Sequence, residues 1–307
     1  MSNNINLAVN VAGLQLKNPV IAASGAFGFG REYSQYFDLN RLGGIAVKGL
    51  TPLPQKGNPP PRIAETPAGI LNSVGLQNPG VHAFIEKEIP FIRGYDTVII
   101  ANASGNTIEE YESMVEILSE ADVDAIELNL SCPNVKQGCM TFGSTSEGVG
   151  QVVERVKRFA KKPLIVKLTP NVTDITEIAK AAEEAGADAV SLINTLLGMA
   201  IDAKTRRPIL GNITGGLSGP AVKPVALRMV YQVSKAVKIP IIGMGGISTG
   251  TDAVEFLLAG ASAIMMGTAG FVNPLAWVET IEGIEAYMRD NGVKSVKELI
   301  GGLIVDL

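Results

Sequence analysis

Polar side chains stand where the short apolar runs of this sequence end. They are Ser24, Lys48, Asn102, Asn129, Lys167 and Asn194. If the runs are parallel strands, these side chains meet at one edge of the sheet, where barrel enzymes build their sites. Contact with solvent explains a serine or an asparagine at a strand end, but a lysine there needs an anionic partner. The pattern therefore favours a functional site over ordinary solvated strand ends.

Two glycine-rich segments follow the last two apolar runs. They are GMGGIS (243–248) and MGTAG (266–270). Small residues let backbone N–H groups approach a phosphate, and a helix that begins there adds a favourable dipole. Tight turning alone is the alternative explanation. Two such segments after the seventh and eighth strands are nevertheless typical of the phosphate site of a barrel, so we predict one here.

Cys132 begins the connection after the fourth apolar run, within ELNLSCPN (127–134). It precedes a proline at the predicted mouth of the sheet, so we do not expect an inert buried thiol. A thiol with an ordinary pKa of about 8.5 can accept a proton, which makes Cys132 a candidate general base. We predict no role for Cys139 or for His82, which is expected to begin a helix after residues 78–80.

The alternation of side chains along a strand also places Glu127 inside, beneath Asn129. A buried carboxylate needs a partner. Lys167, on the next predicted strand, is the nearest candidate.

Eight short apolar runs alternate with longer amphipathic segments. The runs predict strands over 20–24, 44–48, 97–102, 125–131, 164–168, 189–194, 240–244 and 263–266. The segments predict helices over 107–120, 148–161, 174–185, 221–237, 251–258 and 274–290. This alternation is typical of parallel βαβ units, and eight units favour a closed (β/α)8 TIM barrel over an open doubly wound sheet. We expect one domain over 1–307, with residues 7–16 as an N-terminal hairpin that caps the lower end.

Three connections are too long for simple turns. They cover 50–96, 132–147 and 195–220, and each follows a predicted strand. All three should therefore emerge at the C-terminal face, where such barrels place their sites. The first contains PLPQKGNPPPR (52–62), which predicts an irregular excursion at the surface.

The composition narrows the class of protein further. The 307 residues include 26 Lys+Arg and 30 Asp+Glu, a net charge of −4, which argues against a nucleic-acid partner. Hydrophobic residues make up 46%, enough for a large core. Two cysteines and one histidine are too few for a disulfide framework, a four-cysteine cluster or a multi-histidine centre, so we expect no metal site.

The uncharged stretch 256–278 has the length of a membrane span, but glycines, Asn273 and Pro274 interrupt it. A helix end, a buried strand and a glycine loop explain it better. The N-terminus lacks a basic region followed by an apolar one, so we expect no signal peptide, no membrane attachment and a cytoplasmic location. The basic residues between 155 and 162 are interpreted as a solvated helix face.

Seven motifs, taken in order, closely resemble the class 1 dihydroorotate dehydrogenases. They are VKGLT (47–51), NSVGLQNPG (72–80), ELNLSCPNV (127–135), VKLTPN (166–171), GGLSGPA (215–221), GMGGI (243–247) and MGTA (266–269). The resemblance extends from about Asn18 to the C-terminus. Segments 134–143 and 200–224 look like the NAD-linked 1B subgroup rather than the fumarate-linked one. The long N-terminal membrane segment of class 2 is absent.

The resemblance implies an FMN-binding catalytic subunit, with one flavin mononucleotide (FMN) per chain, that oxidises (S)-dihydroorotate to orotate in pyrimidine biosynthesis. Cys132 is then the base that removes the C5 proton, while hydride passes from C6 to FMN, and Lys167 lies beside the flavin ring. The positions that match orotate binding are Lys48, Asn72, Ser73, Val74, Gly75, Leu76, Asn129, Asn194 and Thr195. Those that match FMN binding are Ser24, Lys48, Gly49, Asn102, Asn129, Lys167, Ile193 and Gly219, with Gly245, Gly246, Gly267 and Thr268 at its phosphate.

The resemblance also implies a partner subunit. Relatives in the 1B subgroup pair this kind of chain with an electron-transfer subunit that carries FAD and a [2Fe–2S] cluster. The assembly is a heterotetramer built on a homodimer core. Two cysteines cannot hold such a cluster by four thiolates, and no strand-linked GxGxxG motif is present. Electrons for NAD are therefore expected to leave through the other chain.

Three alternatives stay open. The fumarate-linked enzyme performs the same chemistry with another oxidant. A Schiff-base aldolase would use Lys167 as a nucleophile and bind a substrate phosphate in the glycine loops. A phosphate-binding barrel that serves only as a scaffold would leave Cys132 and both lysines unexplained.

Overall fold

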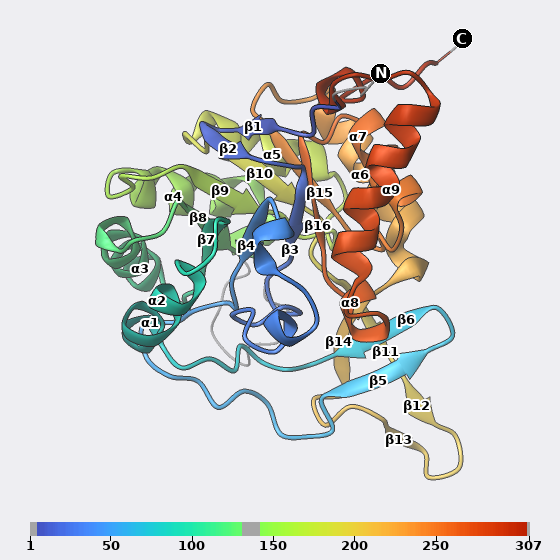
Figure 1. Cartoon of the computed structure of the whole chain (residues 1–307). Coiled ribbons are helices and arrows are strands. Elements are labelled where there is room, and N and C mark those ends of the chain that lie inside the picture. Colours follow the sequence, from blue (N-terminus) through green and yellow to red (C-terminus); the bar gives the residue numbers. More distant parts are fainter. Residues whose placement is uncertain (1–4, 131–141, 306–307) are drawn as a thin grey trace.

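Eight parallel strands close a barrel in the computed structural model, which describes residues 5–130 and 142–305 (Figure 1). Their order is β10-β15-β16-β3-β4-β7-β8-β9, and β9 pairs with β10 to close the ring. The strands are β3 (Val20–Ala22), β4 (Gly44–Ala46), β7 (Val98–Ala103), β8 (Ala125–Asn129), β9 (Leu164–Lys167), β10 (Ala189–Leu192), β15 (Ile241–Met244) and β16 (Ala263–Met266). The predicted barrel is confirmed, and an open doubly wound sheet is excluded.

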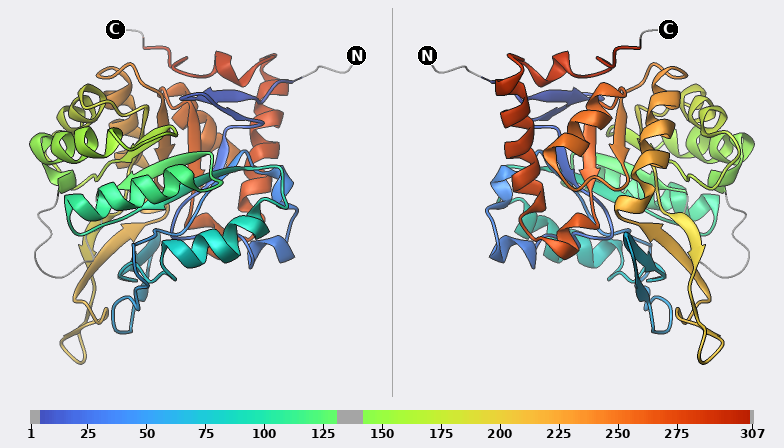
Figure 2. Two further views of the ribbon diagram at one scale, coloured as in Figure 1. Left: turned by 90° about the vertical axis from the view of Figure 1, so that its left-hand side faces the viewer. Right: turned by 90° about the vertical axis from the view of Figure 1, so that its right-hand side faces the viewer.

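Helices cover the outside of the barrel (Figures 1 and 2). They are α1 (Val81–Ala83), α2 (Ile89–Ile92), α3 (Ile108–Glu120), α4 (Ser146–Lys157), α5 (Ile175–Glu184), α6 (Lys223–Ser234), α7 (Gly250–Leu258), α8 (Ala269–Val272) and α9 (Ala276–Asp290). Local signals explain where they begin. Thr107 caps α3 by accepting the Glu110 N–H at 3.2 Å, and Thr249 and Asp252 form a reciprocal capping box on α7. His82 lies in the short α1, as predicted.

Five barrel strands, β3, β4, β8, β9 and β10, end earlier than the apolar runs predict, whereas β15 and β16 end where predicted and β7 ends one residue later. Asn129 and Lys167 are the last residues of β8 and β9, and Asn102 lies one residue before the end of β7. Ser24, Lys48 and Asn194 lie beyond their strands. The reason is visible at Lys48, whose backbone N–H donates to Gly28 O at 3.0 Å and so leaves the ladder. The six side chains still stand at the same end of the barrel.

A hairpin covers the opposite end of the barrel. It consists of β1 (Val9–Val11) and β2 (Leu14–Leu16), and Ala12 and Gly13 turn between them at φ 51° and 89°. Figures 1 and 2 place this hairpin near both chain termini, away from the carboxyl ends of the strands. The predicted cap is confirmed.

The first and third long connections are not loops alone, which corrects the prediction. Residues 63–72 and 196–218 supply a four-stranded antiparallel sheet in the order β11-β14-β6-β5. Its strands are β5 (Ile63–Thr66), β6 (Gly69–Asn72), β11 (Leu196–Met199) and β14 (Thr214–Ser218). A small hairpin of β12 (Ile201–Asp202) and β13 (Arg207–Pro208) projects beyond it (Figure 2). The sheet was missed because β6 and β14 pair across the sequence, and neither shows a long apolar run.

The uncharged stretch 256–278 divides among four elements, α7, β16, α8 and α9. Within the part of the chain that the structure describes, no helix is long and apolar enough to cross a membrane. The basic residues between 155 and 162 lie at the end of α4 and just past it. Several form ion pairs at the surface, such as Arg155 with Glu112 and Arg158 with Glu154. This agrees with the solvated face predicted for them.

Candidate active site

A cavity of about 220 Å³ opens at the carboxyl ends of the barrel strands, far more space than one water molecule fills. The barrel loops form its floor and sides, and the four-stranded sheet closes one wall. Its lining includes Ala23, Ser24, Gly25, Ala26, Lys48, Gly49, Ile63, Ile70, Asn72, Val74, Gly75, Leu76, Asn129, Lys167, Ile193, Asn194, Thr195, Leu217, Ser218, Gly219, Val222, Met244, Gly245, Gly246, Ile247, Ser248, Met265, Gly267, Thr268, Ala269 and Phe271.

Glycines bring backbone close together at one end of the cavity. Gly219, Gly245 and Gly246 have φ angles of 98°, 124° and 76°, which L side chains rarely adopt. A Cβ on Gly246 would lie 2.8 Å from Gly219 O, so the two segments touch there. The backbone N–H groups of Gly246, Gly267 and Thr268 find no acceptor among the described residues. This end therefore offers donors to an anion, and we call these five residues, Gly219, Gly245, Gly246, Gly267 and Thr268, the glycine cradle.

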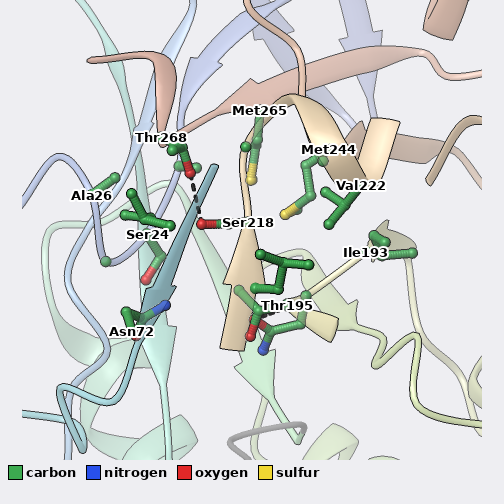
Figure 3. Close-up of a pocket in the computed structure, with 18 of the residues that line it drawn as sticks. Ser24, Ala26, Asn72, Ile193, Thr195, Ser218, Val222, Met244, Met265 and Thr268 are labelled. Atoms are coloured by element: carbon green, nitrogen blue, oxygen red, sulfur yellow. Dashed lines mark hydrogen bonds between the residues drawn. The ribbon is translucent and has the colours of Figure 1, made fainter. Parts of the chain in front are cut away.

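Side chains hold the glycine cradle on two sides. Thr268 Oγ1 donates to Ser218 Oγ at 2.9 Å, which joins the loop after β16 to the end of β14 (Figure 3). The Asp252 carboxylate accepts the N–H groups of Ser248 and Thr249, each at 2.9 Å. Lys223 Nζ donates to Asp252 Oδ1 at 2.6 Å. The loop after β15 is thus attached to the beginnings of both α6 and α7.

Charge pairing shifts the pKa values of this cluster. Hydrogen bonds to Asp252 and then to Glu255 raise the pKa of Lys223. Burial raises the pKa of Asp252, but the hydrogen bonds from Lys223, Ser248 and Thr249 outweigh burial, and the net pKa lies below its usual value. Both groups therefore carry their charges at neutral pH.

A buried polar network lies beneath the middle of the cavity. Glu127 is fully buried and accepts from Asn102 Nδ2 at 2.5 Å and from Ser191 Oγ at 2.7 Å. Lys167 Nζ lies 3.9 Å from Glu127 Oε2. The predicted partnership of Glu127 with Lys167 is confirmed, but the two closer hydrogen bonds were not foreseen. The prediction considered only the next strand along the chain, whereas Asn102 lies on the preceding strand, β7, and Ser191 lies on β10, two strands beyond β8.

Three asparagine amides continue this network toward the cavity. Asn129 Nδ2 donates to Asn102 Oδ1 at 3.4 Å, and Asn194 Nδ2 donates to Asn129 Oδ1 at 3.5 Å. Asn194 Oδ1 in turn accepts the backbone N–H of Thr195 at 2.8 Å. The amide nitrogens therefore donate in sequence, from Asn194 to Asn129 to Asn102, and the last of them donates to the Glu127 carboxylate. Because asparagine carries both donors and acceptors, this order decides which atoms face a ligand.

The added sheet positions a further pair of polar residues. Asn72 on β6 lies opposite Gly216 on β14 and donates from Nδ2 to Gly216 O at 3.3 Å. A Cβ on Gly216 would lie 2.0 Å from Thr195 Oγ1, so only glycine fits beneath Thr195. Asn171 Nδ2 holds Thr195 O at 3.0 Å. Asn72 and Thr195 thus reach the cavity from different connections.

Apolar side chains occupy another side of the cavity. Figure 3 shows Met244, Val222 and Ile193 together, with Met265 close by, across from Ser24. Such a surface suits the flat face of an aromatic ring, while the glycine cradle suits an anion. The cavity therefore has distinct apolar, cationic and anion-binding regions.

The structure brings most of the predicted site residues into one place. Ser73 and Asn102 are the described exceptions, since both are buried and neither lines the cavity. Ser73 Oγ instead accepts from Asn58 Nδ2 at 3.1 Å, and Asn102 acts through Glu127 and Asn129. Cys132 and Cys139 lie outside the described residues.

Sequence reasoning missed several lining residues. Ile63, Ile70, Leu217 and Ser218 belong to the four-stranded sheet, and Phe271 lies on α8. Leu217 and Ser218 had a signal, because both lie inside the GGLSGPA motif. Ile63, Ile70 and Phe271 have no local feature that separates them from ordinary apolar residues. Among residues 5–130 and 142–305, no group of three or more His, Cys, Asp or Glu side chains could hold a metal ion.

This fold and this cavity define a (β/α)8-barrel protein whose ligand site lies at the carboxyl ends of the strands. The family model for dihydroorotate dehydrogenase matches residues 6–288. The chain therefore belongs to the dihydroorotate dehydrogenase family.

Relatives match nearly the whole chain. The "Dihydroorotate dehydrogenase B (NAD(+)), catalytic subunit" of Alkaliphilus metalliredigens is 63% identical over 299 residues, which is 97% of this chain and 99% of the relative. The proteins of the same name from Thermoanaerobacter pseudethanolicus and Bacteroides thetaiotaomicron are each 60% identical. The matches cover 98% of this chain, with 100% and 99% of the two relatives.

Proposed function

We propose that this chain is the catalytic subunit of an NAD-linked dihydroorotate dehydrogenase and oxidises (S)-dihydroorotate to orotate in pyrimidine biosynthesis. One observation carries the proposal. A single cavity joins an anion-binding glycine cradle, an apolar wall, two lysines and three asparagines, in a chain about 60% identical to relatives of that name.

The cavity fits FMN. The glycine cradle leaves backbone donors for a phosphate where any Cβ on Gly245 or Gly246 would clash, at 2.7 Å and 2.8 Å. Met244 and Val222 offer a surface to the ring, and Lys167 is buried beside it with Glu127 as its partner. When bound, FMN supplies the two-electron acceptor for the oxidation. We take residues 1–307 as one FMN-binding domain.

The residues at the other end of the cavity suit a pyrimidine carboxylate. Lys48 neutralises the carboxylate, and Asn72, Asn129 and Asn194 supply donors and acceptors for the ring amides. The backbone of residues 74–76 and Thr195 complete this end. Cys132 follows the strand that carries Asn129 and takes the proton from C5 as a thiolate base.

Lys167 stabilises negative charge that develops beside it during the reaction. Its own position depends on Glu127, which holds the ammonium from below at 3.9 Å. Because the lysine is only 5% exposed, solvent screens this interaction weakly.

The electron path to NAD requires a partner subunit. We propose that a second chain with FAD and a [2Fe–2S] cluster docks on a homodimer of this one, as a heterotetramer in the cytoplasm. The name of the relatives, a catalytic subunit linked to NAD, supports this arrangement. The sequence holds two cysteines, too few for a four-thiolate cluster, and no strand-linked GxGxxG motif, which also supports a route through a second chain.

An anaerobic visible spectrum of the purified chain, titrated with dihydroorotate, tests the proposal. We expect a flavin spectrum that bleaches on addition and stays bleached when NAD is added without the partner. Reoxidation by fumarate would favour the fumarate-linked enzyme instead. A flavin that stays oxidised with dihydroorotate would refute the substrate. A colourless protein that does not bind added FMN would refute the proposal of FMN as the cofactor. It would favour the Schiff-base aldolase instead, which borohydride trapping with substrate would reveal.

A further inference from the structure

Lys223 and Asp252 lie behind the glycine cradle and join its two halves. Gly219 immediately precedes the turn of residues 220–222 and α6, which begins with Lys223. Gly245 and Gly246 precede α7, which carries Asp252. The two halves touch at Gly219 O and Gly246, where an added Cβ would leave only 2.8 Å. Any change in the spacing between α6 and α7 therefore changes the cradle.

The bridge between these helices is short and charged. Lys223 Nζ donates to Asp252 Oδ1 at 2.6 Å and to Glu255 Oε2 at 2.8 Å. The two carboxylates that bind Lys223 differ in whether they also contact the loop after β15. Asp252 Oδ2 also accepts Ser248 N and Thr249 N at 2.9 Å each, whereas the described contacts of Glu255 do not reach this loop.

Burial makes the bridge effective. The side chains of Lys223 and Asp252 are 27% and 15% exposed, against 37% for Glu255. Charge-assisted hydrogen bonds of this geometry are roughly twice as strong as neutral ones. Lys223 is absent from the described lining of the cavity, so its effect on a ligand passes through Asp252 and the loop.

We propose that Lys223 and Asp252 are positioning residues for the phosphate of the flavin nucleotide. They hold residues 245–249 against Gly219, so that the free N–H groups of the cradle converge on one anion. This inference rests on the proposed function, which places a flavin phosphate in the cradle. In this inference Glu255 has a smaller role, because it binds Lys223 but does not contact the loop of residues 245–249.

Riboflavin separates this role from general stability, because riboflavin has the ring of FMN without the phosphate. The experiment measures dissociation constants of both flavins for the full-length apoprotein by fluorescence titration. The variants are Lys223→Met, Asp252→Asn and Glu255→Gln, with Lys235→Met at the far end of α6 as the matched control. Circular dichroism melts verify that each variant is folded.

We expect Lys223→Met and Asp252→Asn to weaken FMN on the order of tenfold, the equivalent of one lost hydrogen bond, and riboflavin less than twofold. Lys223→Arg should restore most of the FMN affinity, because it keeps the charge. Glu255→Gln and Lys235→Met should leave the ratio of the two affinities within about twofold of the wild-type value. If Lys223→Met does not fold, Asp252→Asn and Lys223→Arg carry the test.

Equal losses for FMN and riboflavin would overturn the inference, because they would indicate a general loosening of the barrel. Unchanged FMN affinity in Lys223→Met and Asp252→Asn would overturn it as well. A wild-type chain that binds riboflavin as tightly as FMN would refute the phosphate site itself. If the wild type binds neither flavin, the proposed function fails, and the inference fails with it.

Discussion

Replacing Gly246 with alanine tests whether the glycine cradle depends on close backbone contact. The alanine must adopt a φ of 76°, and its Cβ would lie 2.8 Å from Gly219 O and from Lys223 N. Left-handed backbone costs a non-glycine residue about 1–2 kcal/mol. Overpacking against backbone that cannot easily move adds about 1–3 kcal/mol. We therefore expect a loss of about 2–5 kcal/mol in the free energy of unfolding.

Gly292→Ala is a matched control for this substitution. Gly292 has a similar φ of 68°, but nothing lies within 4 Å of its added Cβ. It lies just past α9, outside the lining of the cavity. The control pays the backbone cost of about 1–2 kcal/mol without the clash. The difference between the two variants therefore isolates the close contacts of Gly246 with Gly219 and Lys223.

Urea denaturation of the two apoprotein variants measures this difference, and fluorescence titration measures the FMN dissociation constant. We expect Gly246→Ala to bind FMN at least tenfold more weakly and Gly292→Ala to bind it as the wild type does. If both variants lose equal stability and bind FMN equally well, the cradle is not closely packed and the reasoning is wrong.

Three further predictions follow from the same site. Cys132→Ser should retain FMN and orotate binding but slow flavin reduction strongly near neutral pH in stopped-flow measurements; a wild-type rate would contradict the base assignment. Lys48→Met should weaken orotate binding at least tenfold in a flavin absorbance titration, whereas exposed Lys56→Met should not; equal affinities would remove Lys48 from the site. The folded-state pKa of Asp252 is lowered, so its contribution is present above its ordinary pKa near 3.8 and is lost as pH falls through the folded value. Asp252→Asn should therefore cost about 1–2 kcal/mol of unfolding free energy at pH 7 and progressively less below pH 4 in urea titrations, and a difference that does not change with pH would exclude this ionisation.

The barrel was predictable because each of its strands lies in a short apolar run, which is the pattern of a buried strand. The run that contains β9 is apolar up to Lys167, and helical segments with one apolar face separate it from its neighbours. Order in the sequence then sets order in the ring, since βαβ units connect adjacent parallel strands. The end of the barrel that carries the site was also predictable, because polar residues such as Asn129 and Lys167 lie at the same end of successive strands.

The position of the glycine cradle was also predictable from the sequence. Gly245 and Gly246 stand between a strand and a helix, and both adopt positive φ angles that glycine reaches without steric cost. The position of the cradle was therefore foreseen. The residues that support it were not, because Lys223 and Asp252 lie on separate helices and carry no motif.

The sequence by itself determined the eight-stranded barrel, the end at which the site forms and the glycines that shape the cradle, because each depends on local periodicity or backbone freedom. Only the tertiary structure decided the wall of the cavity, where Asn72 meets Gly216 across 144 positions. It also decided the two closest partners of Glu127, Asn102 and Ser191, which come from β7 and β10. Such contacts depend on strand register and on the closure of long loops. Local sequence patterns do not predict the free energy of either.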